Sequence, residues 1–138
     1  MRYTIVLLIA LLGLVGCKYE DGPKFSLRSK TARVVNTWYI DQVYENGVDK
    51  TVDYKNAYVN YSVTLRNDHT YELKYRPYNV GDYLETGDWS FSGDKIFINF
   101  KPKGSSSSSS WKILRLKETE TWVLQTINGK EVELRLKD

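Results

Sequence analysis

Cysteine and histidine are almost missing from this chain of 138 residues, which has only Cys17 and His69. A lone cysteine excludes an intramolecular disulfide and a multi-cysteine zinc site. A lone histidine excludes a histidine-rich metal site, and any Ser-His-Asp or Cys-His catalysis would depend on His69 alone. A catalytic histidine also needs an orienting acid and a nucleophile, whereas His69 lies beside a predicted turn. We therefore expect His69 to be exposed and the protein not to be an enzyme.

A strong excess of one charge is missing too, because 20 Lys and Arg stand against 17 Asp and Glu, for a net charge of +3. This balance gives no support for a dedicated nucleic-acid binder. The sequence has no Asp-x-Asp-x-Asp-Gly calcium loop and no glycine-rich phosphate loop. We interpret the carboxylate pairs Glu118/Glu120 and Glu131/Glu133 as solvated strand faces rather than as acid/base pairs or Ca²⁺ ligands. No metal, cofactor or nucleic acid is expected.

Long hydrophobic runs are limited to one segment near the N-terminus. Ile5–Val15 is an apolar run of 11 residues, and a membrane-spanning helix needs about 20. The run follows the basic start Met1-Arg2, an order that is typical of a secretory signal peptide. The remaining length fits one domain.

The four residues Leu14-Val15-Gly16-Cys17 resemble the lipobox of bacterial lipoproteins. This resemblance implies a signal peptide over residues 1–16, cleavage before Cys17, and acyl chains such as palmitate on the Cys17 thiol and the new amine. More than one chain anchors a protein stably in a membrane. Residues 17–27 are interpreted as a tether, and its Lys18-Tyr19-Glu20-Asp21 resembles the surface-export tether of Bacteroidota-type lipoproteins. We expect an outer-membrane lipoprotein of the cell envelope, with surface exposure favoured over the periplasmic face.

The folded domain is predicted over residues 28–138. Ser29 or Thr31 could cap a short helical turn over Lys30–Val35. From Thr37 onward, apolar and polar residues alternate and turn signals recur, which indicates strands. The predicted strands cover Trp38–Tyr44, Thr51–Tyr54, Val59–Leu65, Tyr71–Arg76, Gly87–Phe91, Ile96–Phe100, Lys112–Lys117, Trp122–Ile127 and Val132–Leu136.

Short connections join nearly all of these segments. Asn46-Gly47 and Asn128-Gly129 predict tight hairpins. We interpret Ser105–Ser110 as a long hairpin loop, because the 28 residues that follow it are too few to bury a core of their own. Short connections make consecutive strands antiparallel neighbours. The pattern predicts an all-β fold, an antiparallel up-and-down β-barrel of about eight strands, with a two-sheet β-sandwich as the alternative.

Several short motifs carry a resemblance to a known family. They are Asn36-Thr37-Trp38, the hairpin Leu65–Tyr71, Gly87-Asp88-Trp89, Trp111–Leu116 and Trp122-Val123-Leu124. In this arrangement, residues 28–138 resemble the lipocalin-like domain of small bacterial lipoproteins. The resemblance implies an antiparallel barrel that holds one small apolar molecule without catalysis. It also implies that Trp38 packs under the first strand and closes the bottom of the barrel.

Large aromatic rings dominate the predicted inward-facing positions. An eight-stranded barrel has room for its own side chains or for one small ligand, so a filled or nearly filled core is expected and an aromatic-lined cavity is the alternative. If a ligand binds, the candidate wall residues are Tyr61, Tyr71, Tyr75 and Trp89. The full set of predicted inward rings is Tyr61, Tyr71, Tyr75, Trp89, Phe91, Phe100 and Trp122.

Other aromatic residues lie off the inward pattern, namely Tyr78 and Tyr83 in the predicted loop Tyr78–Tyr83, together with Phe97 and Trp111. Exposed loop aromatics can contact a protein or a glycan. Two functions therefore stay open. The first is a lipid-anchored barrel that binds a small apolar or amphipathic ligand without catalysis. The second is a surface interaction module, an inhibitor for example, with a filled core and a protein or glycan partner.

Overall fold

The computed structural model describes residues 27–78 and 80–138. The predicted signal peptide (1–16), Cys17 and tether residues 18–26 lie outside the described residues. The elements that the described residues form are α2 (Lys30–Val34), β1 (Thr37–Glu45), β2 (Val48–Asp49), α3 (Thr51–Ala57), β3 (Tyr58–Leu65), β4 (Thr70–Pro77), β5 (Tyr83–Phe91), β6 (Phe97–Pro102), β7 (Ser109–Leu116), β8 (Glu120–Ile127) and β9 (Lys130–Lys137).

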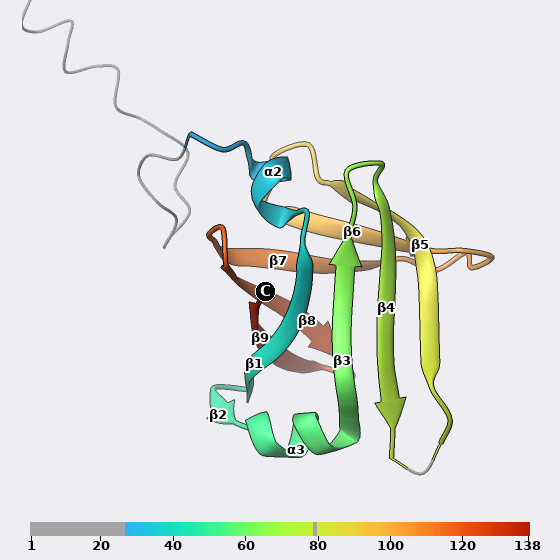
Figure 1. Cartoon of the computed structure of the whole chain (residues 1–138). Coiled ribbons are helices and arrows are strands. Elements are labelled where there is room, and N and C mark those ends of the chain that lie inside the picture. Colours follow the sequence, from blue (N-terminus) through green and yellow to red (C-terminus); the bar gives the residue numbers. More distant parts are fainter. Residues whose placement is uncertain (1–26, 79) are drawn as a thin grey trace, which may run out of the picture.

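The strands form one continuous sheet that closes on itself (Figure 1). Its order is β2-β1-β3-β4-β5-β6-β7-β8-β9, and β1 also pairs with β9. Every pair of neighbours is antiparallel. The result is a closed barrel of eight strands with β2 as an extra strand, which confirms the predicted up-and-down barrel. The sandwich alternative is wrong, because closure through β1 and β9 leaves a single sheet.

Turn chemistry sets the tight hairpins. Asn46 and Gly47 have φ of 48° and 81°, and Asn128 and Gly129 have φ of 50° and 77°. Two consecutive positive φ angles match the twist of flanking antiparallel strands, and Asn-Gly adopts them at low cost. The serine run connects β6 to β7, and β7 begins inside it at Ser109.

One end of the barrel is closed by α2 and by tightly packed side chains, and we call it the closed end. Ser29 caps α2 by accepting a hydrogen bond from the Ala32 amide (3.1 Å). Trp38 is completely buried, and its Nε1 donates to the Val34 carbonyl (2.9 Å). Trp38 therefore packs beneath α2 and helps to close this end of the barrel. The side chains buried at this end include Val34, Trp38, Leu65, Trp89, Ile98, Leu116, Val123 and Leu136.

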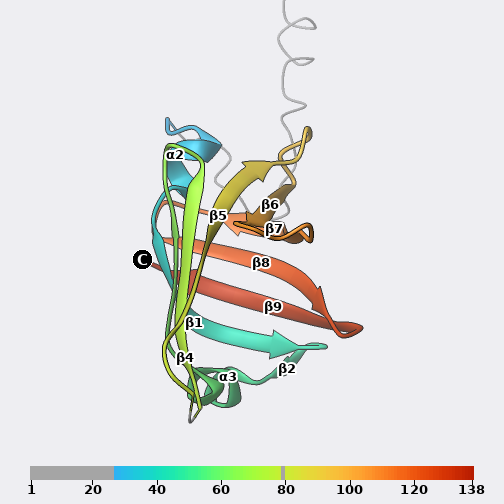
Figure 2. The same cartoon turned by 90° about the vertical axis from the view of Figure 1, so that its right-hand side faces the viewer.

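The other end is spread apart, and α3 packs there. β1 pairs with β3 only from Thr37 to Tyr39 and then follows β9. The two strands diverge beyond that point, and α3 contacts both of them (Figures 1 and 2). We call this end, which also carries the β4–β5 and β6–β7 loops, the open end.

The prediction of a return strand at Thr51–Tyr54 is wrong, because this segment belongs to α3 and the return strand is β2. Thr51 and its neighbour are β-branched, which favours a strand in isolation. The Asp49 carboxylate instead accepts from the Thr51 amide (2.9 Å). The Thr51 hydroxyl in turn accepts from the Val43 amide (3.0 Å). These bonds start the helix and fix it against β1.

A bulge in β3 changes which residues face inward. The register shifts between Val59 and Ser62, and Asn60 has φ of 56°. Tyr58 and Tyr61 therefore both face the interior, although they are three positions apart. Strict alternation with Tyr61 and Val63 would turn Val59 inward, whereas its side chain is 38% exposed.

Two tryptophans exchange the places predicted for them. Trp111 is buried, whereas Trp122 lies on the outer face. There the guanidinium groups of Arg115 and Arg135 each lie 3.9 Å from the Trp122 ring. Trp122 Nε1 also donates to Glu120 (2.6 Å). Cation–π contacts and a charged hydrogen-bond partner explain why this large ring is stable on the outside.

Candidate ligand-binding cavity

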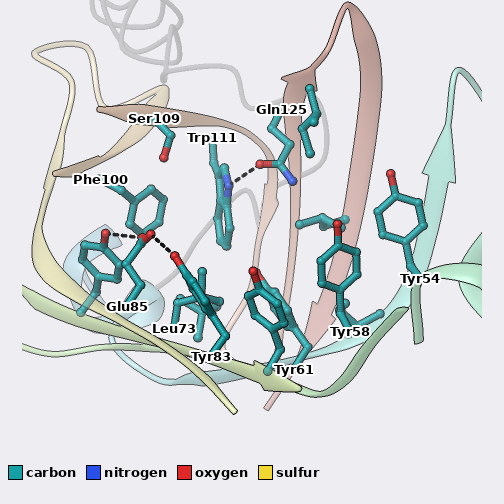
Figure 3. Close-up of a pocket in the computed structure, with 16 residues that line it drawn as sticks. Tyr54, Tyr58, Tyr61, Leu73, Tyr83, Glu85, Phe100, Ser109, Trp111 and Gln125 are labelled. Atoms are coloured by element: carbon teal, nitrogen blue, oxygen red, sulfur yellow. Dashed lines mark hydrogen bonds between the residues drawn. The ribbon is translucent and has the colours of Figure 1, made fainter. Parts of the chain in front are cut away.

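The open half of the barrel holds a cavity of about 270 Å³ (Figure 3). Aromatic side chains and a few polar groups form its wall. The volume lies just below the range of about 300–1,000 Å³ that is usual for ligand sites. The lining residues are Ile40, Tyr54, Tyr58, Tyr61, Val63, Tyr71, Leu73, Tyr75, Tyr83, Glu85, Phe100, Ser109, Trp111, Gln125, Ile127 and Leu134.

Three rings form the boundary between the filled half and the cavity. Tyr71, Phe100 and Trp111 are buried to 1%, 4% and 7% exposure, and all three also line the cavity. Tyr71 meets Phe100 edge to face at 5.0 Å, and Phe100 meets Trp111 in the same way at 4.7 Å. Edge-to-face contacts are a favoured arrangement for aromatic pairs, so this floor is expected to be rigid. The expectation of a nearly filled barrel therefore holds for one half of the molecule only.

Tyrosines from three neighbouring strands form one wall. Tyr75 of β4 lies directly across from Tyr83 of β5, and their rings stack at 4.6 Å. Tyr61 of β3 continues the row at 6.4 Å from Tyr75, and Tyr58 meets Tyr75 edge to face at 5.1 Å. Tyr54 extends the wall from α3, and its hydroxyl donates to Glu45 (3.2 Å). The bulge at residue 60 and the packing of α3 bring these rings together.

Glu85 is the one carboxylate among the lining residues, and two tyrosines hold it in place. Its Oε1 accepts a hydrogen bond from the Tyr71 hydroxyl (2.6 Å). Its Oε2 accepts one from the Tyr83 hydroxyl (2.9 Å), which Figure 3 shows. Burial, together with the bond to Glu85, raises the pKa of Tyr71. The bond to Glu85 raises the pKa of Tyr83 to about 12. Both phenols are therefore neutral donors at physiological pH.

Gly87 makes this arrangement possible. It lies opposite Tyr71 in the β4–β5 pair, and the Tyr71 ring crosses over it to reach Glu85. A Cβ atom at Gly87 would overlap the Lys101 carbonyl oxygen and come within 2.8 Å of the Tyr71 ring. A glycine inside a strand often marks such a close approach.

The wall opposite the tyrosines carries an amide. Trp111 Nε1 donates to Gln125 Oε1 (3.0 Å) across the cavity from the tyrosine row (Figure 3). An indole N–H can only donate, so the amide oxygen faces it and the Gln125 NH₂ group is left for other partners. On the tyrosine side, the hydroxyls of Tyr58, Tyr61 and Tyr75 form no hydrogen bond with any described residue. Burial raises the pKa of Tyr61 and of Tyr75, so the hydroxyls of these two residues are also neutral.

The residues singled out from the sequence are spread over both halves. Tyr61, Tyr71 and Tyr75 line the cavity, whereas Trp89 does not. Trp89 is buried at the closed end, where its Nε1 donates to the Arg66 carbonyl (3.0 Å). Tyr83, assigned to a loop, begins β5 and lines the cavity.

Sequence reasoning missed Glu85, Tyr58, Trp111 and Gln125 as lining residues. The signal for Glu85 was available, because it continues the alternation of Gly87 and Trp89 by one step toward the start of the strand. A charged side chain is, however, usually expected to face solvent. Tyr58 could not be found in the same way, because its inward orientation depends on the bulge at residue 60.

The described part of the chain offers no other chemical centre. His69 is exposed, as expected, and its ring lies 4.8 Å from that of Trp89. Within residues 27–78 and 80–138, no three His, Cys, Asp or Glu side chains gather closely enough to hold a metal ion. Over the same residues, no helix is long and apolar enough to cross a membrane.

Comparison with known proteins identifies the fold. A profile of the lipocalin-like domain family matches residues 34–121, most of the barrel. The chain belongs to the lipocalin-like domain family. Proteins with this fold are generally binding proteins for small hydrophobic molecules, and the barrel is thus a possible small-ligand binding module.

Solved structures of low sequence identity share the fold of this lipocalin-like chain. A lipocalin-like protein from Bacteroides uniformis shares 11% identity at a TM-score of 0.58, and the alignment covers 77% of this chain and 98% of that one. An uncharacterized protein from Bacteroides eggerthii shares 9% identity at a TM-score of 0.55, with 76% and 99% coverage. At these identities the likeness concerns the fold alone. No curated protein matches the chain significantly.

Proposed function

We propose that this protein is a lipid-anchored lipoprotein of the bacterial cell envelope whose barrel binds a small apolar or amphipathic molecule without catalysis. The observation that carries the binding function is the cavity of about 270 Å³ lined by tyrosines in the open half of the barrel. Its wall offers large apolar rings and several hydroxyls without partners among the described residues. Such a mixture of apolar surface and few polar groups is typical of ligand sites.

Binding would consist of equilibrium burial of the ligand against the aromatic wall. Apolar surface that leaves water contributes about 25 cal/mol per Å², while hydroxyl and amide groups orient the ligand. The test is native mass spectrometry of the protein purified gently from the envelope of the cells that produce it. A stoichiometric extra mass, small enough for a cavity of about 270 Å³, is expected and would reveal the cargo. A bare mass that persists after incubation with an envelope lipid and metabolite extract would contradict a carrier function.

The anchoring part of the proposal rests on the lipobox-like Leu14–Cys17. In a bacterial host with an outer membrane, the chain should be recovered with the membranes and should incorporate labelled palmitate. The Cys17→Ser variant should lose the label and leave the membrane fraction. Protease added to intact cells should remove the domain if it faces outward, which we favour over the periplasmic face. Unlabelled protein that stays in the soluble fraction would overturn the anchor.

One observation favours the second candidate, a surface interaction module. In the β4–β5 loop, Tyr78 is 76% exposed and Val80 is 64% exposed. Aromatic anchors of this kind contribute strongly to protein interfaces. If this candidate is correct, a Tyr78→Ser variant should lose a protein or glycan partner in cross-linking on intact cells while its cavity still takes up cargo.

A further inference from the structure

The charged side chains that line the cavity are of one sign only, negative. Among the described residues that line it, Glu85 is the one acidic side chain and none is Lys, Arg or His. Glu85 also forms no ion pair with any residue in the described part of the chain. The carboxylate is therefore held by two neutral phenols and lacks a cationic partner.

A carboxylate has more acceptor capacity than these two bonds use. Its two oxygens offer about four lone-pair sites, and Tyr71 and Tyr83 occupy one on each oxygen. The two phenols fix the orientation of the group and leave room for a further donor. A charge that is partly removed from water costs free energy unless it is paired. A cationic donor in the cavity would supply the missing partner.

The aromatic rings around Glu85 also favour a positively charged ligand. Tyr75 and Tyr83 are stacked, and Tyr58 and Tyr61 lie beside them. The faces of aromatic rings carry partial negative charge and attract ammonium groups. An anionic ligand would meet both these rings and Glu85 with no positive side chain to compensate, so a fatty-acid carboxylate or a phosphate is disfavoured.

The size of the cavity limits the rest of the ligand. An apolar cavity of about 150 Å³ is enough for benzene, so about 270 Å³ accommodates one ring or a branched aliphatic group with a short chain. The NH₂ group of Gln125, on the opposite wall, could donate to an acceptor on that body.

We infer that the cavity selects small organic amines, with the ammonium group on the Glu85 carboxylate and the apolar body among the tyrosine rings. This inference rests on the proposed ligand-binding function and narrows it to one chemical class. It makes Glu85 the residue that determines specificity, while the tyrosines supply most of the contact area.

The test compares three probes of similar size by isothermal titration calorimetry with the protein purified from the expressing cells. They are 2-phenylethylamine (cationic at neutral pH), 2-phenylethanol (neutral) and 3-phenylpropionate (anionic). For the wild type we expect the amine to bind more tightly than the alcohol and the acid not to bind. Glu85→Gln should weaken amine binding roughly tenfold to a hundredfold, since a bond between charged groups contributes about 1.5–3 kcal/mol. It should leave the alcohol nearly unchanged.

Glu72→Gln is the matched control. Glu72 lies on the outer face of the same hairpin, where it pairs with Lys74 (2.5 Å) and Arg66 (3.5 Å). The Glu72→Gln substitution removes the same charge as Glu85→Gln but lies outside the cavity, so amine binding should not change. Equal weakening by both variants would mean that only the overall charge matters, which overturns the inference.

Different results would contradict the selection of amines and the ligand-binding function itself. If the alcohol binds and Glu85→Gln leaves amine binding intact, the selection of amines is wrong but the binding function stands. If the acid binds better than the amine to the wild type, the inference is overturned in the same way. If no probe binds either protein, the cavity does not accept molecules of this size, and the proposed ligand-binding function fails together with the inference.

Discussion

The closed end and the open end of this barrel are built from the same strands, yet their polar side chains form hydrogen bonds with different kinds of partner. At the closed end, the Trp38 and Trp89 indoles and the Arg33 guanidinium all donate to backbone carbonyls. At the open end, Tyr71, Tyr83 and Trp111 donate to other side chains, and further hydroxyls have no partner among the described residues.

This difference separates a structural region from a candidate binding region. A bond to the backbone fixes a ring against the scaffold, and a buried carbonyl left without it carries a penalty of about 1–3 kcal/mol. A bond between two side chains at a cavity wall can be rearranged when a ligand arrives. The cavity-lining side chains that bond to one another therefore distinguish the candidate binding end better than the aromatic rings do, since aromatic rings occur at both ends.

The largest expected effect is at the closed end. Trp38→Ala should lower the free energy of unfolding by about 3–5 kcal/mol, because it removes a completely buried ring. Tyr58→Ala, at the half-buried open end, should cost about 1 kcal/mol, which is typical of point substitutions. Urea unfolding of both variants measures the difference. Equal losses would mean that the open half is packed as tightly as the closed half.

The second-largest loss of stability is expected for a substitution of Gly87, at the boundary between the two ends. Gly87→Ala should destabilise the fold by about 1–3 kcal/mol, because the added Cβ meets the Lys101 carbonyl and the Tyr71 ring. Gly93→Ala is the control, since nothing lies within 4 Å of a Cβ there, and its effect should stay within about 0.5 kcal/mol. A Gly87→Ala protein as stable as the wild type would show that the Tyr71 ring can move without cost.

The closed end was largely predictable from sequence, because its strands follow regular alternation. Trp38, Leu65 and Trp89 are buried there, as regular alternation along their strands indicates. The open end departs from regular alternation at Asn60. A bulge is a local backbone choice that single-sequence periodicity does not contain, so the orientation of Tyr58 could not be predicted.

The predictions for α3 and for the two exchanged tryptophans, Trp111 and Trp122, were wrong for related reasons. The helix is fixed by the bond that the Val43 amide of β1 donates to the Thr51 hydroxyl, which exists only once α3 packs against β1. In β7 the register shifts between Ile113 and Arg115, and in β8 the inward side includes Thr121 and Gln125 while Trp122 faces out. Apolarity alone cannot assign the faces of such a strand.

The bulge itself can be tested next. Asn60→Val should cost about 1–2 kcal/mol, because a β-branched residue resists the left-handed φ of 56°. Asn60→Gly, which accepts this φ, should be close to neutral. If valine is tolerated because the strand becomes regular, NMR contacts between the Tyr61 and Tyr75 rings should disappear and Val59 should become protected. Unchanged stability together with unchanged ring contacts would contradict the importance of the bulge.

The smallest effect is confined to alkaline pH, and it reports on the open end alone. Tyr71 and Tyr83 have pKa values raised above the ordinary 10.0 by burial and by their bonds to Glu85. Above pH 10 the unfolded chain loses these protons before the folded one does, so the stability that they contribute is present below pH 10 and declines as the pH rises toward 12. The Tyr71→Phe/Tyr83→Phe double variant should show a shallower decline in urea unfolding, whereas Tyr78→Phe, whose hydroxyl bonds to no described residue, should keep the wild-type slope. Hydrogen exchange should show the open end losing protection first, while the amides beside Trp38 stay protected. A decline that is identical in all three proteins would mean that Glu85 does not hold the two phenols in solution.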